Sequence, residues 1–343
     1  MKGSSMALPE SAREYLAEQI QRVRRLPRRR RIVFPEGEDP RVQVAAARLA
    51  REGVADPVLI GRQPATVPPG VTFIDPMDSP LTEKYGALYY EKRRTRGITL
   101  NEAKAAARDP MYFAALMVAA GEADAGVGGA VASTAVTFAA AVRCIGTLPK
   151  VRTVSSFFIT AVQDRSFGHK GLLITADPAI VVEPTAVQLA DITLSTAAST
   201  RQVLGVEPTV ALLSFSTKGS AKHRLVDKIQ EALRIIKARD PDLHVDGELQ
   251  ADAALVPAVG QSKAPGSTVA GYANTLIFPD LNSANIGVKL VERLGNAANI
   301  GPFFQGLARP FNDLSRGCSA DDIFNCGVVA ALQSDSDKLA DRG

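Results

Sequence analysis

A turn-rich segment near the carboxyl end of the chain, residues 301–322, contains the residue types that acyl and phosphoryl transfer need. Ser315 supplies a hydroxyl and Arg316 a planar fork of donors that matches a phosphate or an acyl oxygen, while Asp322 supplies a carboxylate able to accept a proton. Pro310 and Gly317 interrupt the segment, so it is not one regular helix or strand. We interpret it as a candidate catalytic centre.

The same residues also fit structural roles. Ser315 is typical of a turn, and Arg316 fits an ion pair with Asp313. The spacing from Ser319 to Asp322 is that of a capping box, which closes the first turn of a helix. Residue types alone favour these structural roles, so the catalytic interpretation needs support from the rest of the chain.

Length and composition indicate a globular α/β protein. The 343 residues predict two domains or one large α/β unit, and apolar residues make up 46% of them. Trp is absent and aromatics are only 6%, which disfavours a stacking platform for nucleic acid. The net charge of +4 suits small anionic substrates as well as nucleic acid. We interpret the arginine run at residues 28–31 as a solvated helix end, so no nucleic-acid partner is expected.

The cysteines and histidines predict no disulfide framework and no metal site. Cys144, Cys318 and Cys326 are odd in number and lack C-x-x-C spacing. No two histidines have the i, i+4 spacing of a zinc site. No apolar run is long enough to span a membrane, and the first residues lack the apolar core of a signal peptide. We therefore expect a cytoplasmic protein with no membrane partner.

The elements before residue 150 predict a parallel sheet. A strand from residue 31, a helix containing residues 42–50 and a strand at 57–61 form a βαβ unit. The carboxylates at residues 36–39 fit turn and N-cap roles better than a metal site. Farther along, a strand from residue 123 enters a glycine turn, and Ser133 and Thr134 follow as N-caps. That turn is a candidate anion site, and close packing of strand and helix is about as good an explanation.

The second half supplies further candidate binding residues. A strand at residues 209–216 runs into a polar turn, where Lys218 marks a second possible anion cradle. Residues 246–250 are expected to begin a helix, and a loop at 263–267 that starts at Lys263 is able to close over a ligand. After a strand at 275–280, a helix presents Asn285 and Arg293 on one face. Its other face carries Ile286, Leu290, Val291 and Leu294.

Five ordered blocks resemble the phosphate acetyltransferase family, and the similarity extends from about residue 30 to 333. The blocks are residues 34–38, 246–250, 263–267, 278–282 and 301–322. The resemblance implies a homodimer of two-domain α/β chains. Each domain has a largely parallel sheet flanked by helices, and the active site lies in the interdomain cleft. The implied first domain comprises residues 1–152 plus 303–343, and the second comprises 153–302.

The implied reaction converts acetyl-CoA and phosphate reversibly into acetyl phosphate and CoA, with CoA as a substrate and no cofactor. By resemblance, Ser315 and Arg316 are the catalytic pair, Asp322 is the catalytic aspartate, and Arg93 and Arg293 bind substrate. We assign Ser315 as a donor to the oxyanion and Asp322 as the base for the CoA thiol. The further candidate substrate-binding residues are Ser133, Thr134, Lys263 and Asn285.

The chain departs from the family pattern at one binding position. Family members often carry an arginine where this chain has Ala139, and Arg143 follows one helical turn later on the same face. Two alternatives to a phosphate acetyltransferase stay open. One is a transferase of longer acyl groups such as butyryl, and the other is a non-catalytic acetyl-CoA-sensing domain like that of malic enzymes. The intact pattern at residues 312–317 favours an enzyme. We expect direct transfer in a ternary complex rather than a thioester on Cys318.

Overall fold

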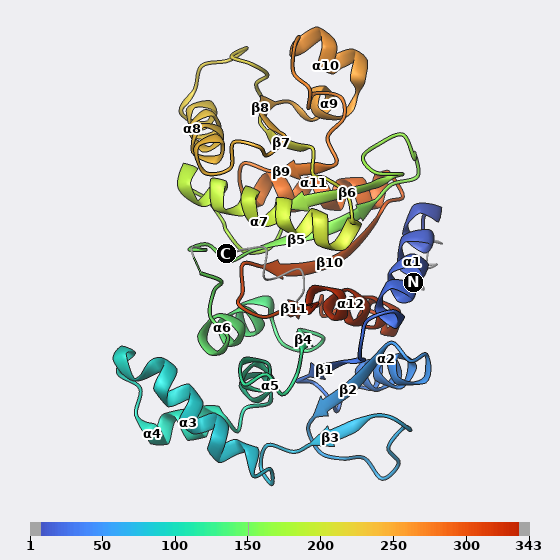
Figure 1. Cartoon of the computed structure of the whole chain (residues 1–343), viewed down its shortest axis with the longest axis vertical. Coiled ribbons are helices and arrows are strands. Elements are labelled where there is room, and N and C mark those ends of the chain that lie inside the picture. The colour runs from blue at the N-terminus through green and yellow to red at the C-terminus, as the bar shows by residue number, and fades with distance from the viewer. Residues whose placement is uncertain (1–7, 150, 336–343) are drawn as a thin grey trace. The chain divides into compact units, whose positions relative to one another are not determined.

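A computed structural model describes residues 8–149 and 151–335 of the chain (Figure 1). The contacts divide it into two compact bodies. We call residues 17–149 and 306–335 the first body, and residues 8–16 and 151–305 the second body. Each has its own sheet with helices packed on it, so the predicted α/β class with two largely parallel sheets is confirmed.

The first body contains a five-stranded sheet in which every pair of neighbours is parallel. Its order is β11-β4-β1-β2-β3, so the strand nearest the carboxyl terminus lies beside β4. The predicted βαβ unit is present as β1, α2 and β2. The strands are β1 (Arg30–Phe34), β2 (Ala55–Ile60), β3 (Thr72–Ile74), β4 (Ala125–Gly128) and β11 (Phe311–Asp313).

The helices of the first body begin where the sequence places their caps. Thr99 and Glu102 form the predicted capping box, and helix α2 buries the expected apolar stripe that includes Val42 and Leu49. The helices are α2 (Pro40–Arg51), α3 (Leu81–Arg93), the short 3₁₀ helix η1 (Arg94–Arg96), α4 (Leu100–Ala106), α5 (Pro110–Ala119), α6 (Thr134–Cys144) and α12 (Ala320–Gln333).

The second body contains a six-stranded mixed sheet of order β10-β5-β6-β9-β7-β8. The pairs β10–β5 and β5–β6 are antiparallel, and the other pairs are parallel. The strands are β5 (Ser155–Ala161), β6 (Leu172–Ala176), β7 (Val210–Leu213), β8 (Val245–Leu249), β9 (Thr275–Ile277) and β10 (Ala298–Gln305). Its helices are α7 (Ala186–Leu204), α8 (Arg224–Arg239), α9 (Ala251–Leu255), α10 (Pro257–Lys263) and α11 (Leu281–Leu294).

One expectation for the second body is wrong. Residues 246–249 do not begin a helix, because Val245–Leu249 is the edge strand β8 paired with β7, and helix α9 begins only after its N-cap Gln250. Helix α11 buries Ala284 and Val288. Its apolar stripe is open to solvent in the single chain, with Ile286 57% exposed and Leu290 52% exposed.

The borders of the two bodies differ slightly from the expected domain limits. Helix α1 (Glu10–Arg24) begins in the second body, where the Ser11 hydroxyl donates to the Val162 carbonyl at 2.9 Å. Strand β10 belongs wholly to the second body, so the border lies after Gln305.

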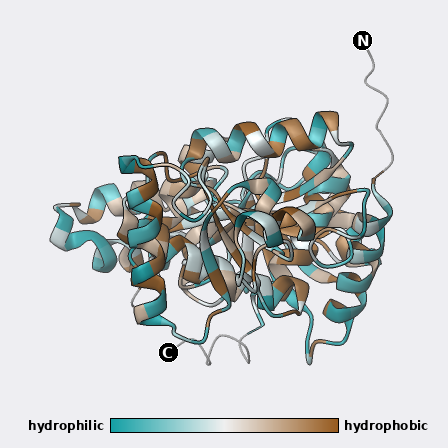
Figure 2. Ribbon diagram, turned by 90° about the horizontal axis from the view of Figure 1, so that it is seen from above, coloured by the Kyte–Doolittle hydropathy of each residue, from teal (hydrophilic) through white to brown (hydrophobic). Residues whose placement is uncertain are grey.

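Apolar side chains fill the spaces between each sheet and its helices, as the brown segments of the strands indicate (Figure 2). Strands β4, β6 and β7 are buried along their full length. Their sequences are mainly apolar without alternation, as expected for strands that are covered on both faces of the sheet. Within the described residues, no helix has the length and apolar character that crossing a membrane would require.

Candidate active site

Three loops of the first body meet at one edge of its sheet. Strands β11, β4 and β1 are parallel neighbours, so the residues that follow them leave the sheet at the same edge. These residues are 35–39 before α2, 129–133 before α6 and 314–319 before α12. In open α/β sheets, ligands bind at this carboxyl edge of the strands. The edge therefore holds Ser315 and Arg316 beside the glycine turn that follows β4.

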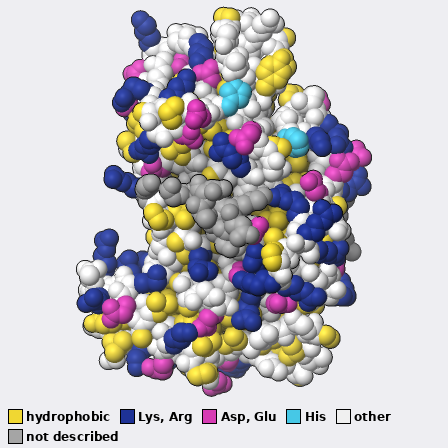
Figure 3. All heavy atoms as spheres, viewed as in Figure 1, with side chains coloured by type: hydrophobic (Ala, Val, Ile, Leu, Met, Phe, Trp, Pro, Cys, Tyr) yellow, Lys and Arg dark blue, Asp and Glu magenta, His cyan; other side chains and the backbone are white. Residues whose placement is uncertain are grey.

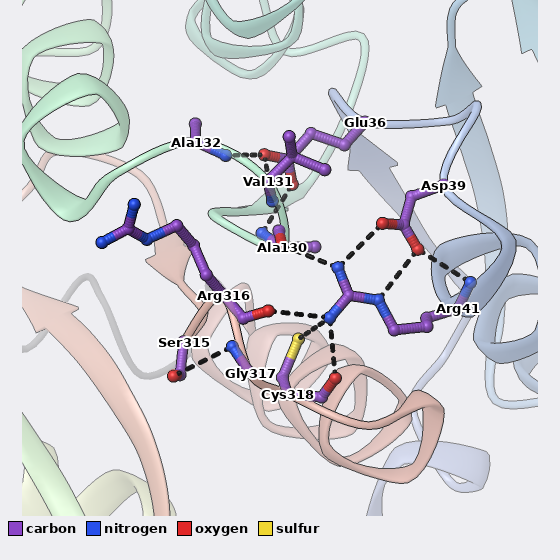
Figure 4. A network of polar contacts seen from close by, with 10 residues as sticks. All are labelled: Glu36, Asp39, Arg41, Ala130, Val131, Ala132, Ser315, Arg316, Gly317 and Cys318. Atoms are coloured by element: carbon purple, nitrogen blue, oxygen red, sulfur yellow. Dashed lines mark hydrogen bonds and ion pairs between the residues drawn. The ribbon is translucent and has the colours of Figure 1, made fainter.

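The glycine turn is occupied by a side chain of the protein itself. The Glu36 carboxylate accepts hydrogen bonds from the backbone N–H groups of Ala130, Val131 and Ala132, at 2.7, 2.9 and 2.7 Å (Figure 4). A carboxylate bound this way satisfies the donors that a substrate anion would need. The turn is therefore a rigid support for the site, and its backbone is not free to serve as an anion cradle.

Arg41 connects all three loops. Its guanidinium donates to the carbonyl oxygens of Ala130 at 2.7 Å, Arg316 at 2.9 Å and Cys318 at 2.9 Å. It also makes a two-pronged ion pair with Asp39, the N-cap of its own helix. The hydrogen bond from Arg41 lowers the pKa of the Asp39 carboxyl, which keeps the pair ionised. Arg41 therefore holds the Ser315–Arg316 loop against the glycine turn.

The side chains of Ser315 and Arg316 are exposed. The Ser315 hydroxyl oxygen accepts one long hydrogen bond, 3.4 Å, from the Gly317 N–H. The Arg316 guanidinium points away from Arg41 (Figure 4) and has no protein acceptor or carboxylate among residues 8–149 and 151–335. The alternative ion pair of Arg316 with Asp313 is absent there. The N–H donors of the Arg316 guanidinium are thus available to bind an anion.

Asp322 occupies the first turn of α12, and the predicted capping box is present. Its carboxylate accepts from the N–H and the hydroxyl of Ser319, both at 2.8 Å. Both bonds go to a single oxygen, Oδ2, and the residue is exposed, so Oδ1 remains available to a proton donor. A role in capping the helix is compatible with a role as base.

Asp313 is a buried carboxylate directly before the Ser315 loop. It is 1% exposed, and its Oδ2 accepts from the Thr134 hydroxyl at 2.5 Å. Its Oδ1 has no hydrogen-bond partner in the described part of the chain. Burial raises the pKa of Asp313 to about 6. Of the two expected N-caps of α6, Ser133 stands at the N-cap position without a side-chain bond, while Thr134 binds this carboxyl.

Arg93 and Arg143 form a cationic cluster around two tyrosines. The Arg143 guanidinium donates to the Tyr112 hydroxyl at 2.7 Å, and Tyr112 stacks edge-on against Tyr89 at 5.6 Å. Both arginines favour the ionised form of Tyr89, whose pKa burial nevertheless raises to about 12. No carboxylate pairs with either arginine among the residues that the structure describes. Figure 3 shows Lys and Arg side chains gathered where α3 passes into α4.

The three candidate residues of the second body are less free than expected. Lys263 is paired with the Asp252 carboxylate at 2.7 Å. Asn285 donates to the Pro178 carbonyl at 3.2 Å. The Arg293 side chain is 77% exposed, and its guanidinium lies 3.3 Å from the Glu292 carboxylate. Of the three, Arg293 is therefore the one whose charge is most open to an anion.

The second possible anion cradle, at residues 217–220, is also filled by the protein. The Glu248 carboxylate accepts from the Gly219 N–H at 2.6 Å, and Lys218 is paired with Asp246. Residues 8–149 and 151–335 include no group of three or more His, Cys, Asp or Glu side chains that would hold a metal ion.

The sequence interpretation missed Arg41 altogether. The only local signal is Asp39, whose N-cap role was expected and is confirmed by its bond to the Arg41 N–H at 2.8 Å. Nothing in the sequence indicates that the side chain of Arg41 reaches carbonyls 275 and 277 residues away. The sequence also gives no sign that Asp313 is buried beside Thr134, since it suggests only an ion pair of Asp313 with Arg316.

Comparisons with known proteins show the family to which the chain is related. The model of the phosphate acetyl/butaryl transferase family matches residues 15–331. A phosphate acetyltransferase of Thermoanaerobacterium thermosaccharolyticum is 47% identical over 313 residues, which cover 89% of this chain and 95% of that protein. The crystal structure of a phosphotransacetylase from Streptococcus pyogenes is similar with a TM-score of 0.88 and 40% identity, over 94% of this chain and 99% of that one.

A more distant solved structure shares the fold alone. A branched-chain phosphotransacylase from Enterococcus faecalis has a TM-score of 0.66 and 17% identity, over 89% of this chain and 99% of that one.

Proposed function

Because the chain belongs to the phosphate acetyl/butaryl transferase family, we propose that it interconverts acetyl-CoA and phosphate with acetyl phosphate and CoA. The observation that carries this proposal is the exposed Ser315–Arg316 pair. It lies at the carboxyl edge of the sheet, and in the described part of the chain no protein group binds the Arg316 guanidinium. The location of the site in a cleft between the two bodies stays a prediction.

The residues divide the chemistry among them. In the direction of acetyl-CoA formation, the CoA sulfur attacks the acyl carbon of acetyl phosphate while Asp322 takes the thiol proton. Ser315 donates to the oxyanion that forms on the acyl oxygen. The carbon–oxygen bond then breaks, and phosphate leaves with its negative charge paired to Arg316. Arg93 and Arg293 supply further positive charge for the phosphate groups of the substrates.

Four further residues are proposed to contact the substrates: Ser133, Thr134, Lys263 and Asn285. The Ser133 hydroxyl makes no capping bond, so it is ready to donate. Thr134, Lys263 and Asn285 already have protein partners, so their contact with substrate requires those bonds to be exchanged.

We propose that transfer is direct, with no acyl group carried on Cys318. Cys318 is buried, and burial raises its pKa to about 11, so its thiol is almost wholly protonated near pH 7. The variant Cys318→Ala should therefore keep most of the turnover. Near-complete loss of activity in a folded Cys318→Ala protein would contradict direct transfer.

The activity is tested by following the thioester absorbance that appears when acetyl phosphate and CoA are mixed with the purified protein. Thioester formation that requires both substrates supports the proposal, and its absence would point to the non-catalytic acetyl-CoA-sensing alternative. Replacing acetyl phosphate with butyryl phosphate tests chain length. A higher kcat/KM for butyryl phosphate would favour the longer-acyl alternative.

We also propose that two copies of the chain associate through helix α11. Its exposed stripe of Ile286, Leu290, Val291 and Leu294 adjoins an apolar cavity of about 370 Å³ lined by Phe278 and Val288. Contiguous apolar surface of this kind is typical of protein interfaces. The cytoplasmic location also stays a prediction.

A further inference from the structure

The guanidinium of Arg41 has a complete set of acceptors. Its five N–H donors face five oxygens. These are both carboxylate oxygens of Asp39 and the carbonyl oxygens of Ala130, Arg316 and Cys318, at 2.7 to 3.1 Å. A guanidinium whose donors are all used has one orientation, so it transmits a fixed position to each loop that it touches. None of its donors is left for a substrate.

The loop that Arg41 holds has little other support. Between Ser315 and Cys318, the local bonds are the Cys318 N–H to the Ser315 carbonyl at 2.8 Å and the long bond to the Ser315 hydroxyl. Ser315, Arg316 and Gly317 are exposed, so packing holds the turn only at its end, where Cys318 is buried. The two bonds that Arg41 donates to the carbonyls of Arg316 and Cys318 therefore tie the backbone of the turn to the glycine turn after β4 and to helix α2.

The opposite side of the network is rigid. Ala130, which accepts from Arg41, also donates its own N–H to Glu36, and Glu36 binds two further N–H groups of the same turn. Asp39 belongs to the first turn of α2, which packs on the sheet. Arg41 thus joins the exposed turn at residues 315–317 to the hydrogen-bonded residues at the ends of two neighbouring strands, β1 and β4.

We propose that Arg41 is a positioning residue, whose guanidinium fixes the backbone of Arg316 and Cys318 and thereby aims Ser315 and Arg316 at the reacting group. The inference rests on the proposed transferase function. Because Arg41 acts through the loop and does not bind substrate, its loss should lower kcat more than it raises KM. A displacement of about 1 Å at a catalytic group is enough to cost about 100-fold in rate.

The test replaces Arg41 with Met, Lys and Ala. Arg41→Met should lower kcat about 100-fold and leave the KM for CoA within about threefold of wild type. Arg41→Lys keeps the charge but has three donors in place of five, so its kcat should stay near that of Arg41→Met. Added guanidinium ion should restore part of the kcat of Arg41→Ala, whereas equal concentrations of sodium chloride or urea should not.

Arg48→Met is the matched control. Arg48 lies on the same helix and also reaches the carboxyl-terminal segment, through Asp321 at 2.8 Å and the ring of Phe324 at 3.8 Å. In the described residues, its polar contacts are with Glu52, Asp321 and Phe324 and do not include residues 314–318. Its loss should lower the unfolding temperature without lowering kcat. Equal losses of stability and kcat in Arg41→Met and Arg48→Met would reduce Arg41 to a structural residue and overturn the proposal.

A second measurement does not depend on activity. Hydrogen–deuterium exchange of the peptide that contains residues 314–319 should become faster in Arg41→Met and stay unchanged in Arg48→Met. Unchanged exchange and unchanged kcat in Arg41→Met would each overturn the positioning role. If the wild-type protein forms no thioester, the transferase function fails, while the exchange experiment still decides whether Arg41 orders the loop.

Discussion

The carboxyl of Asp313 makes the stability of this protein depend on pH in an unusual direction. Its pKa is raised from 3.8 to about 6, chiefly by burial, while the hydroxyl of Thr134 opposes the rise. A group with a raised folded pKa contributes stability that is fully present below its unfolded pKa and is lost as pH rises through its folded pKa. The stability that protonated Asp313 contributes should therefore be lost progressively as pH rises from about 4 to about 6.5, and it should stay lost at higher pH.

The size of the effect follows from the shift. One pKa unit corresponds to about 1.36 kcal/mol, so a shift of about 2 units gives ~3 kcal/mol. Asp313 is 1% exposed, so solvent does not screen this contribution. The variant Asp313→Asn has no proton to lose. The free energy of unfolding of wild type minus that of Asp313→Asn should fall by ~3 kcal/mol between pH 3.5 and pH 7.5.

The assay is urea denaturation followed by far-ultraviolet circular dichroism at several pH values, since the chain has no Trp for fluorescence. Other carboxylates titrate in both proteins and cancel in the difference. Thr134→Val gives a change of opposite sign. It removes the donor that favours the ionised carboxylate, so the loss of stability with pH should become larger than in wild type. Parallel pH profiles for wild type and Asp313→Asn would refute the reasoning.

Three further predictions concern the site and the assembly. In steady-state assays, Ser315→Ala should lower kcat about 10²- to 10³-fold. Asp322→Asn keeps the capping bonds and should lower kcat about 10²- to 10⁴-fold. Wild-type kcat in either variant would remove that residue from the mechanism. Arg143 is proposed to replace the substrate-binding arginine that the family often carries at the position of Ala139. Arg143→Gln should therefore raise the KM for CoA about 10- to 100-fold, while Arg94→Gln, whose arginine already pairs with Glu91, should not. Equal effects of the two variants would deny Arg143 this role. Leu290→Asp should convert a dimer to a monomer in light scattering, and an unchanged mass would place the interface elsewhere.

Interactions that span a few residues could be predicted from the sequence. The capping boxes from Thr99 to Glu102 and from Ser319 to Asp322 form between neighbours within one helical turn. The parallel sheet of the first body follows from alternating strands and helices, because a crossover helix forces its two strands to run parallel. The segment that contains Ser315 was likewise identified from its residue types and its resemblance to a family.

Contacts between distant segments were decided by the tertiary structure alone. The N–H groups of both expected anion cradles are occupied by glutamates, Glu36 and Glu248, which come from 94 and 29 residues away. Residues 246–249 belong to strand β8 because β7 offers them a partner, although their local pattern favoured a helix. The exposed face of α11 is open because the sheet packs against a narrower stripe.

Residues 301–322 show where the two kinds of information divide. The sequence by itself determined that Ser315, Arg316 and Asp322 stand in one turn-rich segment that ends at a helix cap, because these relations are local. Only the tertiary structure decided that Arg41 holds the backbone of this segment, since strand β11 must first lie beside β4 and β1 to bring the three loops together. A side chain can bridge loops that are far apart in sequence only after the sheet has placed their ends side by side.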